Sequence, residues 1–318
     1  MLLSRVANSL YWMGRYLERA ENANRHLLVA GEFAVELEGI DEEIALTEWG
    51  SLLSSMALPG SESEWKSRED ALDYMASFLV DLDNPFSVFS SLGKARDNAR
   101  SVGETITFEI TTNLNEAHRR LRRVRRSSLT DLGVARDIAA KTHNSILTTL
   151  GAIEHTLTRG EGWDYLKLGE AIERTQRTLF VLKMRLPSLA ERAEDADSPL
   201  YYASWRSLLR SLASLENYRM EYGPRFHTEA VTRFLLFHPS APRAVNCGVL
   251  RMAGYLRRMS EAVPGIRESR RRLGQLAARL EFDQDEILCE GALVEFIDES
   301  LALLKEVNEL LYQPVRLG

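Results

Sequence analysis

The chain has 318 residues, of which 45% are hydrophobic and 27% are charged, and its net charge is −6. A chain of this size can bury a large core without covalent cross-links. Its acidic balance excludes nonspecific nucleic-acid binding as the main task, because that task normally requires a basic excess. Cys247 and Cys289 lack the paired spacing of a disulfide framework or a zinc site. We therefore expect no nucleic-acid partner.

The first 30 residues predict where the protein resides. Arg5, Arg15 and Glu18 interrupt them, so they resemble neither a signal peptide nor a membrane anchor. We expect a cytoplasmic protein that does not contact a membrane.

Apolar residues recur at helical spacing along almost the whole chain, as at Leu10, Met13 and Leu17. No stretch shows the alternation typical of a strand. All nine prolines fall at the edges of periodic stretches, where proline begins or ends helices. We predict an all-α fold, a single compact body of about twelve helices. The expected helices span residues 4–38, 44–57, 64–81, 85–101, 104–126, 131–158, 163–186, 199–221, 227–237, 241–261, 265–282 and 287–311.

An eight-residue element occurs twice. Residues 14–21, Gly-Arg-Tyr-Leu-Glu-Arg-Ala-Glu, return 155 positions later as residues 169–176, Gly-Glu-Ala-Ile-Glu-Arg-Thr-Gln. Further matches keep the same order, with residues 49–53 returning as 205–209 and Pro85 as Pro242. This order indicates an internal duplication.

The duplication predicts the domain organisation. We expect one domain made of a first half, residues 1–160, and a second half, residues 161–318. Gly160 and Gly162 mark the turn between them. Because this link is short, the halves should form two bundles related by a pseudo-two-fold axis.

The repeated element also predicts a close contact. Glycine inside a helix costs about 1 kcal/mol relative to alanine, so Gly14 and Gly169 indicate that another backbone or a ligand comes close. Glu18 and Arg19 point about 100° apart on a helix and must find partners elsewhere. The same holds for residues 173 and 174.

Two interpretations of these charges remain open. The Glu and Arg side chains could form ion pairs that lock the halves in register. Alternatively, they could line a polar cleft that binds a charged small molecule or a peptide end. Arg96 and Arg100 lie one turn apart with Glu104 a turn further on, a row suited to carboxylate binding.

Other site types receive less support. None of the six histidines follows a glutamate by three positions, as a di-metal site in a helical bundle would require, so we expect no metal. The basic run at residues 118–126 could contact RNA or an acidic partner, but a solvated helix end is favoured. No phosphate loop or nucleotide-binding motif occurs, so we expect this chain to bind no cofactor.

Residues 3–22, Leu-Ser-Arg-Val-Ala-Asn-Ser-Leu-Tyr-Trp-Met-Gly-Arg-Tyr-Leu-Glu-Arg-Ala-Glu-Asn, closely resemble the start of the bacterial Alpha-E family, a helical domain named for its Glu-Arg motif. The resemblance covers essentially the whole chain. Glu170 and Gly103 depart from it, because the family usually has arginine at both positions. Similar agreement runs through Asn-Pro at 84–85, Ala-Arg-Asp-Asn-Ala-Arg-Ser-Val at 95–102, Glu-Gly-Trp at 161–163, Leu-Gly at 168–169 with Glu-Arg at 173–174, and Pro-Arg-Ala-Val at 242–245.

The charged and amide side chains of these motifs are our candidate binding residues. They are Arg15, Glu18, Arg19, Glu21, Arg96, Asn98, Arg100, Glu104, Glu173, Arg174, Arg177 and Arg243.

The resemblance also implies partners. Members of the family are typically encoded beside, or fused to, a circularly permuted ATP-grasp amide ligase and a transglutaminase-like peptidase. The chain is thereby expected to serve a system that makes or trims an amide or peptide bond. ATP and Mg²⁺ are implied only for the partner ligase.

Two functional hypotheses follow. The first is a noncatalytic helical module that docks the ligase or presents its charged substrate. The second is an enzyme that acts on a carboxylated or amidated small molecule or peptide. Glu18 or Glu173 would then be the acid or base, and arginines would orient the substrate.

Overall fold

The computed structural model describes residues 3–56, 67–129, 131–191, 198–289 and 291–311, and within these ranges the chain is helical and has no strand. The all-α class is therefore confirmed. The helices of the first half are α1 (Ser4–Glu36), α2 (Glu42–Ser54), α3 (Arg68–Val80), α4 (Val88–Ser101), α5 (Phe108–Arg122), the short 3-10 helix η1 (Arg126–Ser128) and α6 (Leu132–Thr156). Those of the second half are α7 (Glu161–Glu191), α8 (Pro199–Ser211), α9 (Leu215–Tyr222), α10 (Thr228–Phe237), α11 (Val245–Arg258), α12 (Ile266–Phe282), α13 (Gln284–Ile287) and α14 (Ala292–Leu311).

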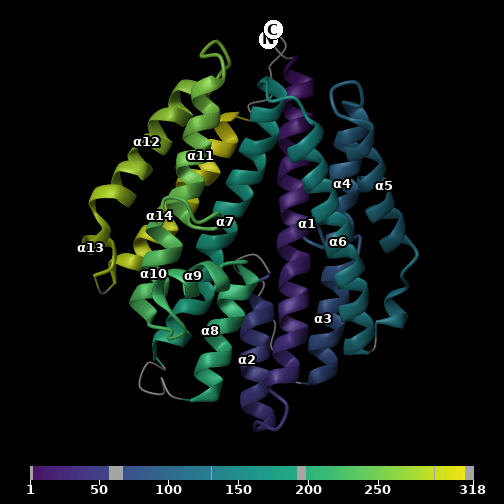
Figure 1. Cartoon of the computed structure of the whole chain (residues 1–318), viewed down its shortest axis with the longest axis vertical. Coiled ribbons are helices and arrows are strands. Elements are labelled where there is room, and N and C mark those ends of the chain that lie inside the picture. The colour runs from purple at the N-terminus through teal and green to yellow at the C-terminus, as the bar shows by residue number, and fades with distance from the viewer. Residues whose placement is uncertain (1–2, 57–66, 130, 192–197, 290, 312–318) are drawn as a thin grey trace.

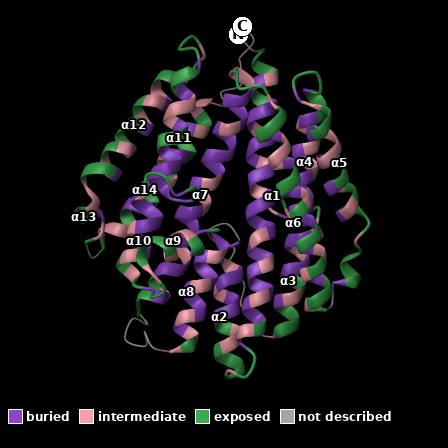
Figure 2. Cartoon of the chain, in the orientation of Figure 1, coloured by how far each residue is buried: buried purple, intermediate pink, exposed green. Residues whose placement is uncertain are grey.

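The two longest helices, α1 and α7, lie side by side at the centre of the body (Figure 1). Helices α4, α5 and α6 lie on one side of this pair, and α11, α12 and α14 on the other. Buried residues run along both central helices, whereas exposed residues gather on the outer helices (Figure 2). A helix covered on nearly every face must bury its polar side chains as well, and these then need partners inside the body.

One predicted helix is broken and one short helix, α13, was not expected, so the described residues form fourteen α-helices where we expected about twelve. The predicted helix 199–221 breaks at Ala213, whose φ of 48° is left-handed. The helix predicted at 287–311 begins later, at Ala292, directly after Gly291, whose φ is 83°, and the short α13 overlaps that prediction only at Ile287. Glycine adopts a left-handed conformation without steric cost, so Gly291 could have indicated a helix boundary. The alanine at position 213 gives no such indication.

The expectation that every proline lies at a helix edge is wrong for Pro187. It lies inside α7, which continues to Glu191. Proline lacks the N–H that a helix interior uses, yet here its ring is exposed and the helix ends one turn later. The expected turn between α6 and α7 is present. The duplication of the two halves stays a prediction.

Helices α1 and α7 approach most closely at two glycines. A Cβ atom at Gly14 would lie 2.1 Å from the main-chain oxygen of Leu166, and one at Gly169 would lie 2.1 Å from that of Tyr11. The contact is thus the same on both sides of the crossing. No side chain fits at either position, and the predicted close approach of another backbone is confirmed.

Candidate functional site

Just beyond the crossing, the Glu-Arg elements of the two helices pair with each other. Nε and Nη2 of Arg174 donate to the two carboxylate oxygens of Glu18, at 3.0 and 2.5 Å. Nε and Nη2 of Arg19 donate in the same way to Glu173, at 2.7 and 3.0 Å. Paired donors of this kind are the strongest form of Arg–carboxylate contact. Both carboxylates are buried, and the side chain of Glu18 has no exposed surface.

Each carboxylate also holds a second guanidinium group. Arg15 donates to Glu173 at 2.6 Å, and Arg243, from the turn before α11, donates to Glu18 at 2.8 Å. Arg243 also bonds Glu21, at 2.6 Å, and Glu21 pairs in turn with Arg25. We call these eight side chains the Glu–Arg network: Arg15, Glu18, Arg19, Glu21, Arg25, Glu173, Arg174 and Arg243.

The network favours the charged forms of Glu173, Glu21 and Arg174. Burial alone raises the pKa of Glu173, but Arg19 and Arg15 lower it by more, so that it ends well below its usual range. Burial likewise raises the pKa of Glu21, and Arg243 and Arg25 bring it down to about 2. Burial lowers the pKa of Arg174, and Glu18 more than restores it. A carboxylate held in this way is poorly placed to exchange protons near neutral pH.

The structure brings together only part of the predicted set. Beyond the network, Nη1 of Arg177 donates to the main-chain oxygens of Ser55 and Met56 at the end of α2, at 3.1 and 3.2 Å. This guanidinium group satisfies carbonyls at a helix C-terminus, which is a structural role.

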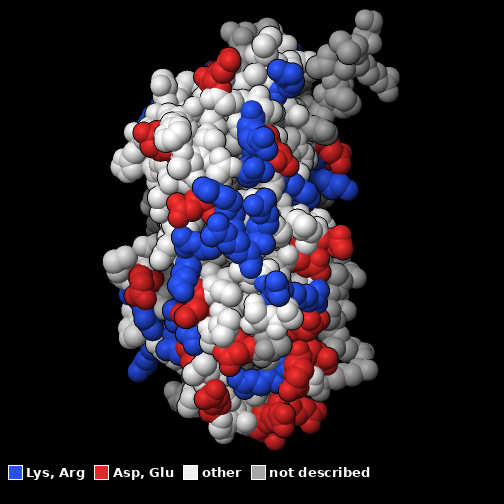
Figure 3. All heavy atoms as spheres, turned by 90° about the vertical axis from the view of Figure 1, so that its right-hand side faces the viewer, with Lys and Arg blue, Asp and Glu red and all other residues white. Residues whose placement is uncertain are grey.

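The predicted residues of α4 and of the turn after it also lie outside the network. Arg96 donates to Asn115 of α5 at 2.6 Å, and Asn98 donates to a main-chain oxygen of its own helix. Arg100 and Glu104 are exposed. On the face that carries α5, Lys and Arg gather across the middle and Asp and Glu nearer the lower end (Figure 3).

A cleft of about 400 Å³ opens beside the network, and we call it the α7 cleft. Helix α7 forms its floor, while α6 and α11 form its walls. Arg174 belongs to both the cleft and the network, which places the cleft directly against the paired Glu-Arg elements. The lining residues are Leu150, Gly151, Glu154, Trp163, Lys167, Glu170, Arg174, Arg251 and Tyr255, and a narrow end extends to Pro242 and Gly248.

The charges in the α7 cleft are incompletely paired. The ammonium group of Lys167 bonds Glu154 at 2.7 Å and pairs with one oxygen of Glu170. The side chain of Glu170 is only 2% exposed, and its Oε1 has no hydrogen-bond partner in the part of the chain that the structure describes. An unmet buried acceptor of this kind costs about 1–3 kcal/mol.

Burial also changes the acidity of this carboxylate. It raises the pKa of Glu170, and the neighbouring Lys167 and Arg174 offset that effect only in part. On the wall of the cleft, Arg251 is exposed and forms no ion pair with any described residue. Sequence reasoning missed Lys167, Arg251 and Tyr255. The one available signal was Glu170, where the chain departs from the family pattern.

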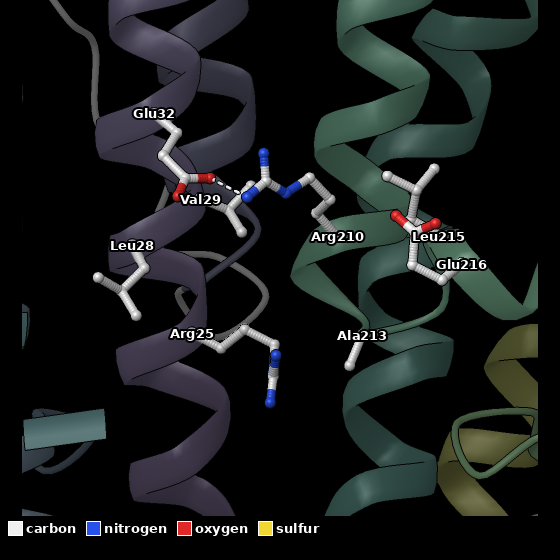
Figure 4. A pocket seen from close by; sticks show the side chains of 8 residues that line it. All are labelled: Arg25, Leu28, Val29, Glu32, Arg210, Ala213, Leu215 and Glu216. Carbon is white, nitrogen blue, oxygen red and sulfur yellow. Dashed lines mark ion pairs between the residues drawn. The ribbon is translucent and has the colours of Figure 1, made fainter. Parts of the chain in front are cut away.

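A second hollow, of about 280 Å³, lies between α1 and the pair α8 and α9, and we call it the α1 groove (Figure 4). Arg210 reaches across it to Glu32, at 2.5 Å. Arg25 pairs with Glu21, and Glu216 lies 3.5 Å from Arg219. The charges that line this groove therefore have partners, in contrast to those of the α7 cleft.

The described residues contain neither a metal-ligand cluster nor a membrane-spanning helix. Among the described residues, no group of three or more His, Cys, Asp or Glu side chains is arranged to hold a metal ion. None of the described helices has the length and apolar character needed to cross a membrane.

The fold and the network define a class of protein: an all-α body whose two central helices cross at paired glycines and are joined by reciprocal Glu–Arg contacts. The chain belongs to the Alpha-E family, described as a predicted alpha-helical domain with a conserved ER motif, whose model matches residues 2–314. The reciprocal pairs involve the two Glu-Arg elements of this chain, Glu18-Arg19 and Glu173-Arg174.

Relatives of the chain are longer proteins. The uncharacterized proteins Mb2597 of Mycobacterium bovis, and MT2643 and Rv2567 of Mycobacterium tuberculosis, are each 25% identical to it over 328 aligned positions. The match covers 96% of this chain but only 36% of each relative, so the chain spans about a third of their length. No solved structure shows a significant match.

Proposed function

We propose that this chain is a noncatalytic helical module of an ATP-grasp amide or peptide ligase system in the cytoplasm, and that it binds the ligase or its charged substrate. The observation that carries the noncatalytic role is the saturation of Glu18 and Glu173. Each is buried and holds two guanidinium groups. Each accepts three hydrogen bonds from these groups, and removing one partner from such a buried pair is strongly destabilising, as expected of a structural lock.

The partners in this proposal come from the family resemblance. The first is a circularly permuted ATP-grasp protein, which would bind the ATP and Mg²⁺, and the second is a transglutaminase-like peptidase. The length of the relatives supports a modular role, because a domain of this kind there forms about a third of a longer chain. The α7 cleft offers a place for a charged small molecule or peptide end beside the network.

The test is association with a circularly permuted ATP-grasp protein from the same organism. The two proteins would be mixed at micromolar concentration, with and without ATP and Mg²⁺, and separated by size-exclusion chromatography. We expect a common peak that elutes earlier than either protein. Two independent elution profiles under both conditions would contradict the proposed partnership.

The enzyme hypothesis has a separate test. If Glu18 or Glu173 were the acid or base, Glu18→Gln and Glu173→Gln would abolish product formation by the reconstituted system while the protein stayed folded. We expect instead a loss of stability, because each change leaves buried guanidinium groups without a countercharge. Full stability together with lost product formation would restore the enzyme hypothesis.

A further inference from the structure

The α7 cleft differs from the α1 groove in having two unmet charged groups of opposite sign. Oε1 of Glu170 is a buried acceptor without a donor, and the guanidinium group of Arg251 is a donor without an ion-pair partner in the described chain. Both residues line the wide cleft and also its narrow end, so they converge on the same space. A ligand that satisfies both must carry a hydrogen-bond donor and an anionic group, and the strongest donor to a carboxylate is a charged one such as an ammonium group.

The other charges around the α7 cleft are balanced. Arg174 is neutralised by Glu18, Lys167 bonds Glu154 and Glu170, and Glu154 also lies 3.6 Å from Arg159. What remains is the unmet oxygen of Glu170, which requires a donor, and the positive charge of Arg251. A phosphate or a dicarboxylate would meet the carboxylate of Glu170, whereas a molecule with one charge of each sign matches both ends.

We propose that the α7 cleft binds a zwitterionic α-amino acid or short peptide, whose ammonium group donates to Oε1 of Glu170 and whose carboxylate accepts from Arg251. This assignment rests on the proposed function, because it names the charged substrate that the module would present. The cleft volume of about 400 Å³ falls within the range of small-molecule sites, about 300–1,000 Å³. Trp163 and Tyr255 supply aromatic walls.

Calorimetric titration of the full chain with four probes tests the proposal. L-alanine and L-alanyl-L-alanine carry both charges and distinguish a free amino acid from a peptide. N-acetyl-alanyl-alanine lacks the ammonium group, and alanyl-alanine amide lacks the carboxylate. We expect each blocked dipeptide to bind about tenfold more weakly, or worse, than the better of the two zwitterions. Equal binding of zwitterions and blocked probes, or no binding of any probe at millimolar concentration, overturns the proposal.

Arg251→Ala tests whether Arg251 binds the carboxylate of the ligand. Its side chain is exposed and unpaired, so the variant should fold normally. We expect it to bind the dipeptide about as weakly as the amide, so that the difference between these two probes disappears. Arg257→Ala, at another exposed arginine of α11 that does not line the cleft, is the matched control and should leave both affinities unchanged. If the Arg251→Ala variant still binds the dipeptide more tightly than the amide, Arg251 does not belong to the binding site.

The two proposals can fail separately. Peptide binding is measured on this chain alone, whereas the proposed partnership is measured by coelution with the ATP-grasp protein. Zwitterion binding without coelution would leave the cleft assignment standing and remove the partner. Coelution without zwitterion binding would do the reverse.

Discussion

The two flanks of the α1–α7 crossing share a backbone arrangement but differ in how their charges are used. On the α1 flank, Trp12 stacks on Tyr16 with ring centroids 5.5 Å apart, and the guanidinium group of Arg15 lies 5.6 Å from the Trp12 ring. On the α7 flank, the positions 155 residues further along hold Lys167 and Glu170. These leave the α7 cleft open and one buried oxygen without a partner.

This contrast separates architecture from function. The Glu-Arg pairs are reciprocal across the crossing, as expected of a structural lock. The residues one turn before them are unequal, with Arg15 directed into the network and Glu170 lining a cleft. Ligand binding requires unmet groups, so the unequal positions are the better place to look for it.

The largest expected effect concerns the crossing that both flanks share. Gly14→Ala or Gly169→Ala would place a Cβ atom 2.1 Å from a main-chain oxygen, so α1 and α7 must separate. We expect either variant to lower the free energy of unfolding by about 3 kcal/mol or more, measured by denaturant titration. If either variant were as stable as the unmodified protein, the close crossing would be wrong.

Gly274→Ala is the control for this experiment. It lies within α12, where an added Cβ would meet nothing within 4 Å. The change should stabilise the protein by up to about 1 kcal/mol, because alanine favours the helix.

The next prediction compares one cation from each flank. Arg15→Met leaves Glu173 short of a partner, and we expect a loss of about 3 kcal/mol because this carboxylate cannot take up a proton easily. Lys167→Met leaves Glu170, whose pKa is already raised, able to protonate, so the loss should be about 1 kcal/mol. Denaturant titrations of the two variants at neutral pH measure the difference, and equal losses would argue against a functional contrast between the flanks.

The carboxylates of the network and of the cleft should respond to pH in opposite directions. The pKa of Glu21 falls from 4.5 to about 2 on folding, so its contribution is fully present above pH 4.5 and is lost as the pH falls toward 2. The pKa of Glu170 rises on folding, so stability declines as the pH increases above 4.5 and this group ionises. The measurement is the free energy of unfolding across this range for the unmodified protein, Glu21→Gln and Glu170→Gln.

Each variant should remove one of these two trends. The unmodified protein should have a larger free energy of unfolding than Glu21→Gln near neutral pH, and this difference should shrink in acid. Relative to Glu170→Gln, it should become less stable as the pH rises. Parallel curves for the two comparisons would contradict the assignment of the two carboxylates to different environments.

Much of the fold could be predicted from the sequence because helical periodicity and glycine placement are local signals. The all-α class and the close approach at Gly14 and Gly169 both follow from such signals. The break at Ala213 could not be predicted, because its left-handed backbone depends on how α8 and α9 pack. Family membership was visible in the motif residues and is confirmed by the family model.

The candidate site was harder to predict because a charged residue does not reveal its partner. The sequence predicts that Glu18, Arg19, Glu173 and Arg174 lie at one site. It leaves open whether they bind each other or a ligand. Only the geometry pairs them across the crossing. Arg251 escaped notice because it belongs to no repeated or recognised motif, and its place in the cleft follows from the packing of α11 on α7.

The smallest expected effect concerns the α1 groove. Its charges are paired, whereas those of the α7 cleft are not all paired. Arg210 and Glu32 are both about one-third exposed, so Arg210→Ala removes an ion pair that solvent already screens. We expect a loss of at most about 1 kcal/mol and unchanged dipeptide affinity, because every charge this change touches lies outside the α7 cleft. Weaker dipeptide binding in this variant, with Arg251→Ala unaffected, would move the binding site from the α7 cleft to the α1 groove.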